Sequence, residues 1–328
     1  MEPLHIVCIG GGTGLSALLH GLKDYAGETR QVEITAVVTV TDDGGSSGRL
    51  RRDFDVLPPG DIRSCMVALA EDEGVLSRLF EYRFGAGRGL KGHSFGNLFL
   101  MALTHVMGDF SLAVRTSSEI LASRGRIYPA TARNVTLVAE LESGRVVAGE
   151  TRISRSRSRI RRIRLNPEHC EPLPQTLEAI ARADLITLGP GSLYTSIIPN
   201  LLVDGLAEAI RQSPAIKATY INLMSQPGET NGLTAADHIA AIQDHAGGRL
   251  TDVAVLNTGE ISEEMADKYA AQRAHPVMND VDRISKLGVK VLGANLLCQD
   301  DKIRHNSTAA AAIAMELARR GRRRRQAQ

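Results

Sequence analysis

The chain has 328 residues, 43% hydrophobic and 4% aromatic with no Trp, so its core must consist mainly of Leu, Val, Ile and Ala, as in parallel sheets covered by helices. The formal net charge is +2, but six of the last ten residues are Arg, so the remainder carries −4 and we do not expect a nucleic-acid binder. With no apolar run near the roughly 20 residues of a membrane span, no signal-peptide pattern and four scattered Cys, we expect a cytoplasmic protein without membrane insertion.

Apolar runs predict buried strands that mostly alternate with helix patterns. This alternation is typical of an α/β fold with a mostly parallel sheet. The expected strands are Ile6–Ile9, Ile34–Val40, Val135–Leu141, Leu185–Leu188, Ala218–Leu223, Val253–Leu256 and Val289–Leu292. The expected helices are Leu15–Leu22, Gly96–Val106, Leu173–Arg182, Leu201–Gln212, Thr234–Asp244, Ser262–Ala274 and Thr308–Arg319.

Two segments interrupt the alternation. Residues 61–126 are rich in helix patterns and indicate a helical insertion over the edge of the sheet where a nucleotide would bind. Residues 135–165 read as antiparallel strands, and seven Arg between positions 152 and 164 indicate a solvated surface there. We expect one domain over residues 1–320, followed by a disordered Arg-rich tail at 321–328.

A glycine-rich turn joins the first strand to the first helix. Its residues Gly11, Gly12, Thr13 and Gly14 would bring backbone N–H groups and a helix N-terminus close to a phosphate. The turn lacks the Lys of a Walker A motif, and its glycine spacing departs from the dinucleotide fingerprint. The alternative is a tight turn with a purely structural role.

A second loop, Asp42-Asp43-Gly44-Gly45-Ser46-Ser47-Gly48, follows the next strand. The carboxylates of Asp42 and Asp43 suit a ribose diol or Mg²⁺, and Ser46 and Ser47 suit an anion. The alternative is a loop that caps the next helix.

Further polar residues follow other strands or open helices. Because the carboxyl ends of parallel strands meet at one edge, we expect these residues to share one ligand site. No acid–His–nucleophile set and no zinc-ligand spacing is present, so no catalytic residue is nominated. For Ser94, beside His93, helix capping is the alternative. The added candidates are Arg63, His93, Asn97, Gly189, Gly191, Ser192 and Asn222.

Five of these motifs together resemble the gluconeogenesis factor family (YvcK-like) of the CofD-like superfamily. The resemblance implies a Rossmann-like three-layer fold, a homodimer, binding of UDP-sugars such as UDP-N-acetylglucosamine, and a role in cell shape and envelope growth under gluconeogenic conditions. It also implies that a late Tyr and a late Arg bind the UDP-sugar, by position Tyr269 and Arg304. Tyr suits stacking on uracil and Arg suits a diphosphate. The motifs are Gly10–Ser16, Val40–Arg49, Pro58–Arg63, Gly92–Asn97 and Leu188–Ser196.

Three functions remain open from the sequence. The first is a UDP-sugar-binding regulator without turnover, which requires no cofactor and whose downstream protein partner the sequence does not name. The second is a CofD-type transferase of a nucleotide-activated phospholactate-like group, with Mg²⁺ held by Asp42 and Asp43. The third is an NAD(P)-binding protein, although the chain offers no clean candidate for the acidic residue that would hold the ribose.

Overall fold

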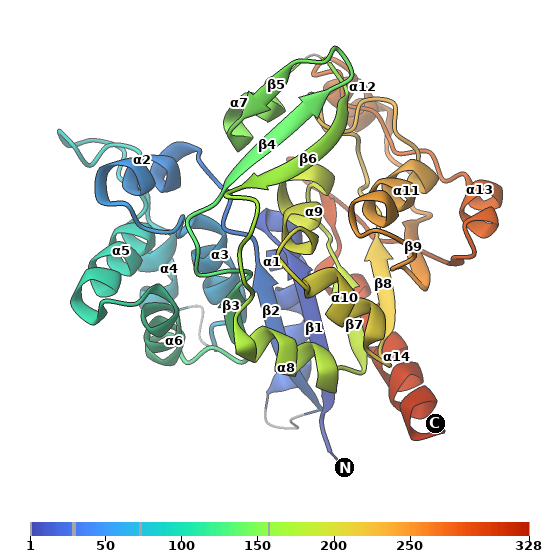
Figure 1. Cartoon of the computed structure of the whole chain (residues 1–328), viewed down its shortest axis with the longest axis horizontal. Coiled ribbons are helices and arrows are strands. Elements are labelled where there is room, and N and C mark those ends of the chain that lie inside the picture. Colours follow the sequence, from blue (N-terminus) through green and yellow to red (C-terminus); the bar gives the residue numbers. More distant parts are fainter. Residues whose placement is uncertain (1, 28–30, 72–73, 157, 328) are drawn as a thin grey trace.

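Within residues 2–27, 31–71, 74–156 and 158–327, which the computed structural model describes, the centre of the molecule is a seven-stranded parallel sheet (Figure 1). Its strand order is β10-β9-β8-β7-β1-β2-β3. The predicted parallel sheet is thus confirmed. Its strands are β1 (Leu4–Gly10), β2 (Val32–Val38), β3 (Arg126–Pro129), β7 (Leu185–Leu188), β8 (Ile216–Tyr220), β9 (Val253–Asn257) and β10 (Lys290–Ala294).

The first strand lies in the interior of the sheet and sets the position of the site. Ile6, Val7, Cys8 and Ile9 are all buried, because helices cover both faces of a parallel sheet. β1 pairs with β2 on one side and with β7 on the other. The chain therefore winds outward in opposite directions on the two sides of β1, and a crevice is expected at this switch point.

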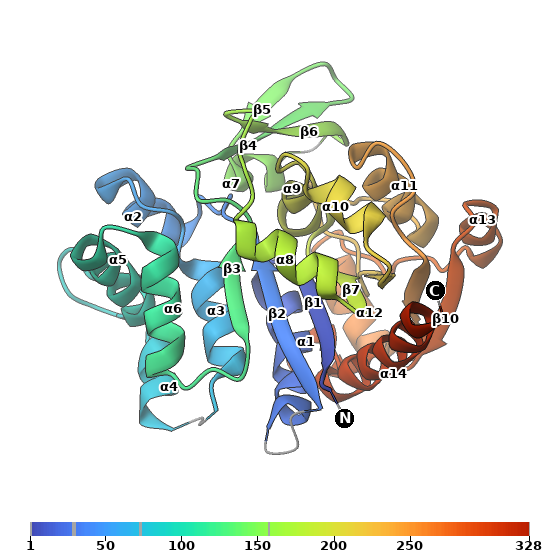
Figure 2. The ribbon, with the colours of Figure 1, turned by 60° about the horizontal axis from the view of Figure 1, so that its bottom comes forward.

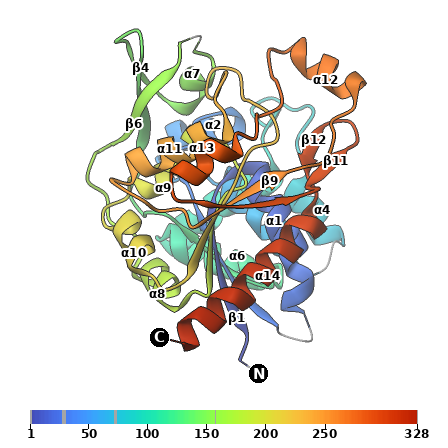
Figure 3. The ribbon, with the colours of Figure 1, turned by 90° about the vertical axis from the view of Figure 1, so that its right-hand side faces the viewer.

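Helices cover both faces of the sheet and complete the predicted three layers. α1 and α3 pack together with α14 on one face, and α8 packs on β1 at the other face beside α10 (Figures 2 and 3). The bounds are α1 (Gly12–Lys23), η1 (Asp24–Ala26), α3 (Gly60–Leu69), α8 (Pro174–Arg182), α9 (Ile198–Leu201), α10 (Leu206–Gln212), α11 (Ala235–His245), α13 (Val281–Lys286) and α14 (Ser307–Gln326).

The helical insertion is present, but its place in the fold differs from the prediction. Its helices connect β2 to β3, the seventh strand of the sheet, which the sequence did not predict because only Ile127 and Tyr128 lie between Arg126 and Pro129. Helices α4 to α6 gather beside the β3 edge rather than over the strand ends (Figure 1). The bounds are α2 (Gly45–Phe54), α4 (Val75–Glu81), α5 (Phe95–Met107) and α6 (Phe110–Ile120).

The antiparallel excursion is confirmed. Strands β4 (Thr136–Leu141), β5 (Val146–Ala148) and β6 (Ile160–Asn166) form a three-stranded sheet, and the short α7 (Glu150–Ser154) connects β5 to β6. The described arginines of the basic run are exposed, while Arg157 lies outside the described residues. The remaining elements are the π-helical turn η2 (Leu193–Ile197), α12 (Glu263–Ala270), β11 (Leu297–Gln299) and β12 (Ile303–His305).

The prediction of a disordered tail is wrong for residues 321–327. Helix α14 continues to Gln326 and ends against the start of β7. Gly321 approaches the Asp184 carbonyl so closely that a Cβ would overlap it. Arg322 Nη2 and Arg325 Nη2 lie 2.7 and 3.2 Å from the carboxylate oxygens of Asp184, which is fully buried. The buried carboxylate thus holds the Arg-rich end in place; Gln328 lies outside the described residues.

We expect Arg322→Ala to lower the free energy of unfolding by about 3 kcal/mol, because the buried Asp184 carboxylate loses a bidentate partner. Urea unfolding of the purified protein would measure this change. The matched control is Arg323→Ala on the exposed side of the same helix, which should stay within about 0.5 kcal/mol of wild type. Equal stability of both variants would contradict the stabilising role of the ion pair between Arg322 and Asp184.

No helix in the described ranges combines the length and the hydropathy needed to span a membrane.

Candidate functional site

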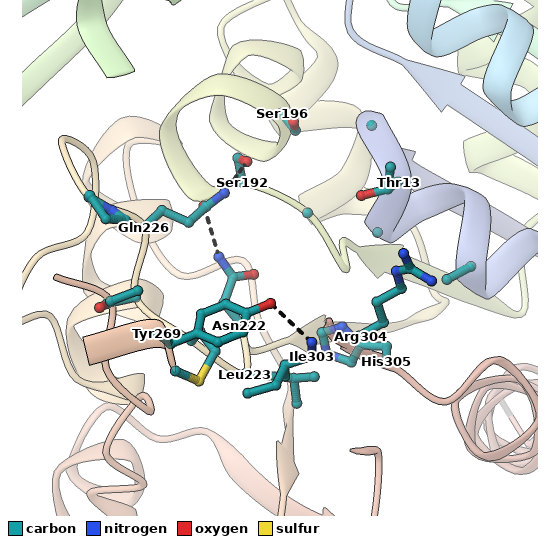
Figure 4. A pocket seen from close by; sticks show the side chains of 18 of the residues that line it. Thr13, Ser192, Ser196, Asn222, Leu223, Gln226, Tyr269, Ile303, Arg304 and His305 are labelled. Atoms are coloured by element: carbon teal, nitrogen blue, oxygen red, sulfur yellow. Dashed lines mark hydrogen bonds between the residues drawn. The ribbon is translucent and has the colours of Figure 1, made fainter. Parts of the chain in front are cut away.

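A cavity of about 390 Å³ opens at the carboxyl ends of β1, β7 and β8, at the switch point of the sheet (Figure 4). One wall comes from the glycine turn after β1 and the loops after β7 and β8, and the opposite wall from α12 and β12. Nine of the predicted ligand-binding residues line it: Gly11, Gly12, Thr13, Gly14, Gly191, Ser192, Asn222, Tyr269 and Arg304.

The glycine turn has the geometry of an anion site. Gly11 precedes α1 in extended conformation without a side-chain cap, and Gly12 has a φ of +65° that favours glycine. The first-turn N–H groups of a helix lack intrahelical acceptors, and the helix dipole adds positive potential there. The turn therefore suits a phosphate group of a ligand.

The turn after β7 lies directly against the first glycine turn. A Cβ at Gly14 would lie 2.7 Å from the carbonyl oxygen of Pro190 and 2.9 Å from the nitrogen of Gly191. Gly189, another predicted site residue, has a φ of +77° and is not part of the cavity lining. Glycine is thus required at position 14 because two backbones meet there.

Tyr269 and Arg304 form the opposite wall. The Tyr269 hydroxyl accepts a hydrogen bond from the Ile303 N–H at 3.0 Å, so α12 and β12 are joined at the cavity. Arg304 Nη2 lies 3.4 Å from Asp301, and its side chain is 54% exposed. In Figure 4 the Arg304 side chain reaches from β12 toward α1. Because its ion pair with Asp301 is exposed, the guanidinium is in a position to bind an anion between β12 and the glycine turn.

His305, also on this wall, was not nominated from the sequence. Burial lowers its pKa to about 4, and Nε2 lies 3.3 Å from the Ile221 carbonyl oxygen. The imidazole is therefore neutral at pH 7, and Nε2 donates to that carbonyl. This bond attaches β12 to the end of β8.

The second predicted loop does not reach the cavity. Ser46 and Ser47 are buried, and Ser46 Oγ lies 3.0 Å from His93 Nδ1. A Cβ at Gly60 would lie 2.5 Å from Ser47 Oγ, which shows how closely α2 and α3 pack. These residues join the loop to the helical insertion, so Ser46, Ser47 and His93 lie outside the lining of this cavity, and their role in ligand binding stays a prediction.

Arg63 and Asn97 also lie away from the cavity lining. Arg63 donates to the Phe80 carbonyl oxygen at 3.4 Å and to Ser64 Oγ at 3.0 Å, within the helical insertion. Asn97 is buried, and its Oδ1 has no hydrogen-bond partner within the described part of the chain. The opening of α5 is thus packed into the insertion rather than presented to the cavity ligand.

Carboxylates gather behind the glycine turn. A Cβ at Gly11 would lie 2.5 Å from Asp61 Oδ2. Burial and the neighbouring Asp42 raise the pKa of Asp61 to about 7, and burial with the same neighbour raises the pKa of Glu150 to about 9. Asp43 Oδ1 instead accepts hydrogen bonds from Thr151 N–H and Oγ1 at 2.8 and 2.6 Å.

The fit of this cluster to Mg²⁺ is partial, because hydrogen bonds already occupy its carboxylates: Asp42 Oδ1 accepts from the Gly44 N–H at 2.8 Å, and Asp61 accepts from the Gly12 N–H. Carboxylate oxygens are suitable ligands for Mg²⁺, but Asp43 is engaged by Thr151. In the described ranges, no group of three or more His, Cys, Asp or Glu side chains is arranged to hold a metal ion. Any Mg²⁺ here would therefore need further oxygen ligands from water or from a bound phosphate.

We expect Glu150→Gln to stabilise the protein at pH 8 by about 2 kcal/mol and to leave it unchanged near pH 4. The pKa of Glu150 is raised on folding, so unfolding releases a proton and wild-type stability falls as pH rises from about 4.5 to about 9. Glutamine does not titrate, so the variant lacks this decrease in stability with rising pH. Thermal unfolding between pH 4 and 9 would measure it, with the exposed Glu168→Gln as the control. A variant that is less stable than wild type at pH 8 would contradict the assignment.

Several cavity residues were missed. Ser196 ends the motif Leu188–Ser196 but was not nominated, Gln226 follows the predicted strand Ala218–Leu223, and Gln272 carried no signal in the sequence. A polar residue soon after a strand end, such as Gln226, is the signal that could have been used. The other missed residues are Ala17, Leu223, Met224, Ser225, Pro227, Ala274, Ile303 and His305.

The sheet order, the glycine turns at its switch point and the cavity between them define a Rossmann-like α/β protein with a ligand crevice at the strand ends. The family model of 2-phospho-L-lactate transferase CofD matches residues 6–297. The chain belongs to the CofD family and, within it, to the gluconeogenesis factors, as the following relatives show.

Two gluconeogenesis factors are similar to the chain over nearly their full length. That of Halalkalibacterium halodurans is 46% identical over 317 residues, covering 96% of this chain and 97% of the relative. That of Bacillus subtilis is 46% identical over 313 residues, covering 95% and 97%. A crystal structure of a protein from Bacillus halodurans has a TM-score of 0.92 at 46% identity and covers 96% of this chain and 100% of that one. These similarities confirm the family and the fold.

Proposed function

We propose that this protein is a UDP-sugar-binding regulator that does not convert its ligand. The observation that carries the proposal is the placement of Tyr269 and Arg304 opposite the glycine turn, across one cavity. The turn and Arg304 suit a diphosphate, and the Tyr269 ring suits the face of uracil. Among the cavity residues that the structure describes, no nucleophile is paired with a base, which favours binding over turnover.

The proposal includes a cellular role. The similar proteins are named gluconeogenesis factors, which supports a role when carbon enters through gluconeogenesis. We propose that this role concerns cell shape and envelope growth. A regulator of this kind would act in the cytoplasm as a homodimer and report UDP-sugar supply to a protein partner.

Calorimetric titration tests the proposal. The purified protein is titrated with UDP-N-acetylglucosamine, UDP-glucose, GDP and NAD, each with and without Mg²⁺, and the ligand is recovered and analysed by chromatography. Micromolar binding restricted to UDP-sugars, with intact ligand recovered, supports the regulator. Preference for NAD, or absence of binding to every UDP-sugar, would overturn it.

A CofD-type transferase is the second candidate, and the carboxylates behind the glycine turn favour it. Asp42 and Asp61 would hold Mg²⁺, which would supply charge neutralisation at a pyrophosphate. Gly11 lines the cavity, and a Cβ there would lie 2.5 Å from Asp61 Oδ2, so an ion at Asp61 and the ligand phosphates would meet at the turn. Mg²⁺-dependent conversion of a nucleotide-activated ligand, lost in Asp61→Asn, would establish this function in place of the regulator.

We expect Tyr269→Ala to weaken UDP-sugar binding about tenfold, because the aromatic ring and its hydroxyl are both removed. Tyr269→Phe keeps the ring and loses only the bond to the Ile303 N–H, so we expect a loss of about threefold. Calorimetry with UDP-N-acetylglucosamine measures both affinities. Equal losses in the two variants would show that the hydroxyl, and not the ring, matters for binding.

A further inference from the structure

Three polar side chains on the cavity wall form one hydrogen-bonded chain, Ser192–Gln226–Asn222, which we call the amide relay (Figure 4). Gln226 Nε2 donates to Ser192 Oγ at 2.6 Å, and Asn222 Nδ2 donates to Gln226 Oε1 at 3.3 Å. All three residues line the cavity. The relay therefore connects the loop after β7 to the loop after β8 at the place where a ligand would lie.

The main chain of Gln226 is held firmly by its own turn. Its N–H donates to Thr230 Oγ1 at 2.8 Å, and its carbonyl accepts from the N–H groups of Glu229 and Thr230 at 3.0 and 2.9 Å. The Glu229 carboxylate, which is buried, accepts from Thr195 Oγ1 at 3.2 Å in η2. Because the turn is fixed at both ends, the Gln226 amide is presented to Ser192 and Asn222 in one orientation.

The hydrogen bonds within the relay leave an available donor at one end and an available acceptor at the other. Ser192 Oγ already accepts from Gln226, so its own hydrogen remains available to donate. Asn222 already donates through Nδ2, and within the described ranges no donor is bonded to its Oδ1. The relay thus presents a donor at Ser192, next to Gly191 and the glycine turn, and an acceptor at Asn222.

We propose that Gln226 is a positioning residue that makes the site select uracil over cytosine, an inference that rests on the proposed UDP-sugar binding. Asn222 Oδ1 accepts the N3–H of uracil, while Ser192 donates to a phosphate oxygen. Tyr269, on which the base stacks, lies beside Asn222 in the cavity (Figure 4). Cytosine carries a lone pair at the same ring position, which opposes the Asn222 oxygen and leaves both acceptors unpaired.

Two variants of Gln226 separate the two ends of the relay. Gln226→Leu removes the anchor of the Asn222 amide, which is then free to rotate and to present Nδ2 to cytosine. Gln226→Glu still accepts from Asn222, so uracil selection is retained, but it also accepts the Ser192 hydrogen and places a negative charge near the phosphates. The first variant should change selectivity, and the second should change affinity for both nucleotides.

The test is calorimetric titration of each protein with UDP and with CDP. We expect wild type to prefer UDP by about tenfold or more, Gln226→Leu to reduce that preference to about twofold, and Gln226→Glu to weaken both nucleotides about tenfold at an unchanged ratio. Gln212→Leu, at an exposed position of α10, is the matched control and should behave as wild type. Thermal unfolding midpoints show that each variant is folded.

Other outcomes overturn the relay. Equal binding of UDP and CDP by wild type would show that Asn222 does not read the base, while UDP-sugar binding and the proposed function would stand. Equal weakening of both nucleotides in Gln226→Leu would show a structural role only. Absence of binding to UDP and to UDP-N-acetylglucosamine alike would overturn the proposed function together with the relay.

Discussion

Replacement of Arg304 by Ala is expected to weaken UDP-sugar binding by about 2–3 kcal/mol, or roughly 30- to 150-fold in Kd. The guanidinium faces the glycine turn across the cavity, and Asp301, its one carboxylate neighbour among the described residues, is itself 69% exposed. A ligand diphosphate would therefore gain a charge-assisted bidentate contact without breaking a buried ion pair. Calorimetry with UDP-N-acetylglucosamine measures the loss.

The same contact predicts that Arg304→Lys recovers only part of the affinity, because an ammonium cannot bind two phosphate oxygens in the planar geometry of a guanidinium. Stability should not change, since the Arg304 side chain is 54% exposed. Arg319→Ala, on the exposed surface of α14, removes the same charge elsewhere and is the control. Wild-type affinity in Arg304→Ala would remove Arg304 from the site.

The central sheet was predictable because most of its strands are buried on both faces. Leu185–Leu188 was predicted with its observed bounds, since three of its four residues are large and apolar and the strand is enclosed by Asp184 and Gly189. β3 was not predictable in this way, because an edge strand of four residues with an Arg and a Pro carries no such run. The helical tail was missed for another reason: its order depends on Asp184, which is 138 residues away from Arg322 in the sequence.

In the candidate site too, residues at strand ends could be predicted, and residues placed by long-range contacts could not. The glycine turn and the loop after β7 come together because β1 and β7 are neighbours, which strand-end reasoning anticipates. The same reasoning gives the wrong position for the loop around Ser46, because the Ser46 hydroxyl is buried between α2 and the start of α5, where it contacts His93 and Ser94. Gln226 contributes through hydrogen bonds to Ser192 and Asn222, and His305 through one to the Ile221 carbonyl oxygen. The contacts to Ser192 and Ile221 join residues that are 34 and 84 positions apart, which no local pattern encodes.

The replacement of Gly14 by Ala is expected to destabilise the protein by about 3 kcal/mol and to weaken UDP-sugar binding at least tenfold. Helix propensity alone predicts the opposite sign, because alanine is favoured over glycine inside a helix by about 1 kcal/mol. The steric contact outweighs helix propensity, since a Cβ at Gly14 would lie 2.7 Å from the Pro190 carbonyl oxygen and 2.9 Å from the Gly191 nitrogen. Both neighbours are backbone atoms, so the loop that carries Ser192 must move as a whole.

Gly12→Ala is the matched comparison within the same turn. Its Cβ would meet only Ser196 Oγ, at 3.9 Å, so space is available and the cost is the strain of a positive φ, about 1 kcal/mol. Urea unfolding and calorimetry on both variants separate close backbone contact from conformational strain. If Gly14→Ala is as stable as wild type, the two turns are not in contact in solution, and the shared phosphate site that we place between them would have to be abandoned.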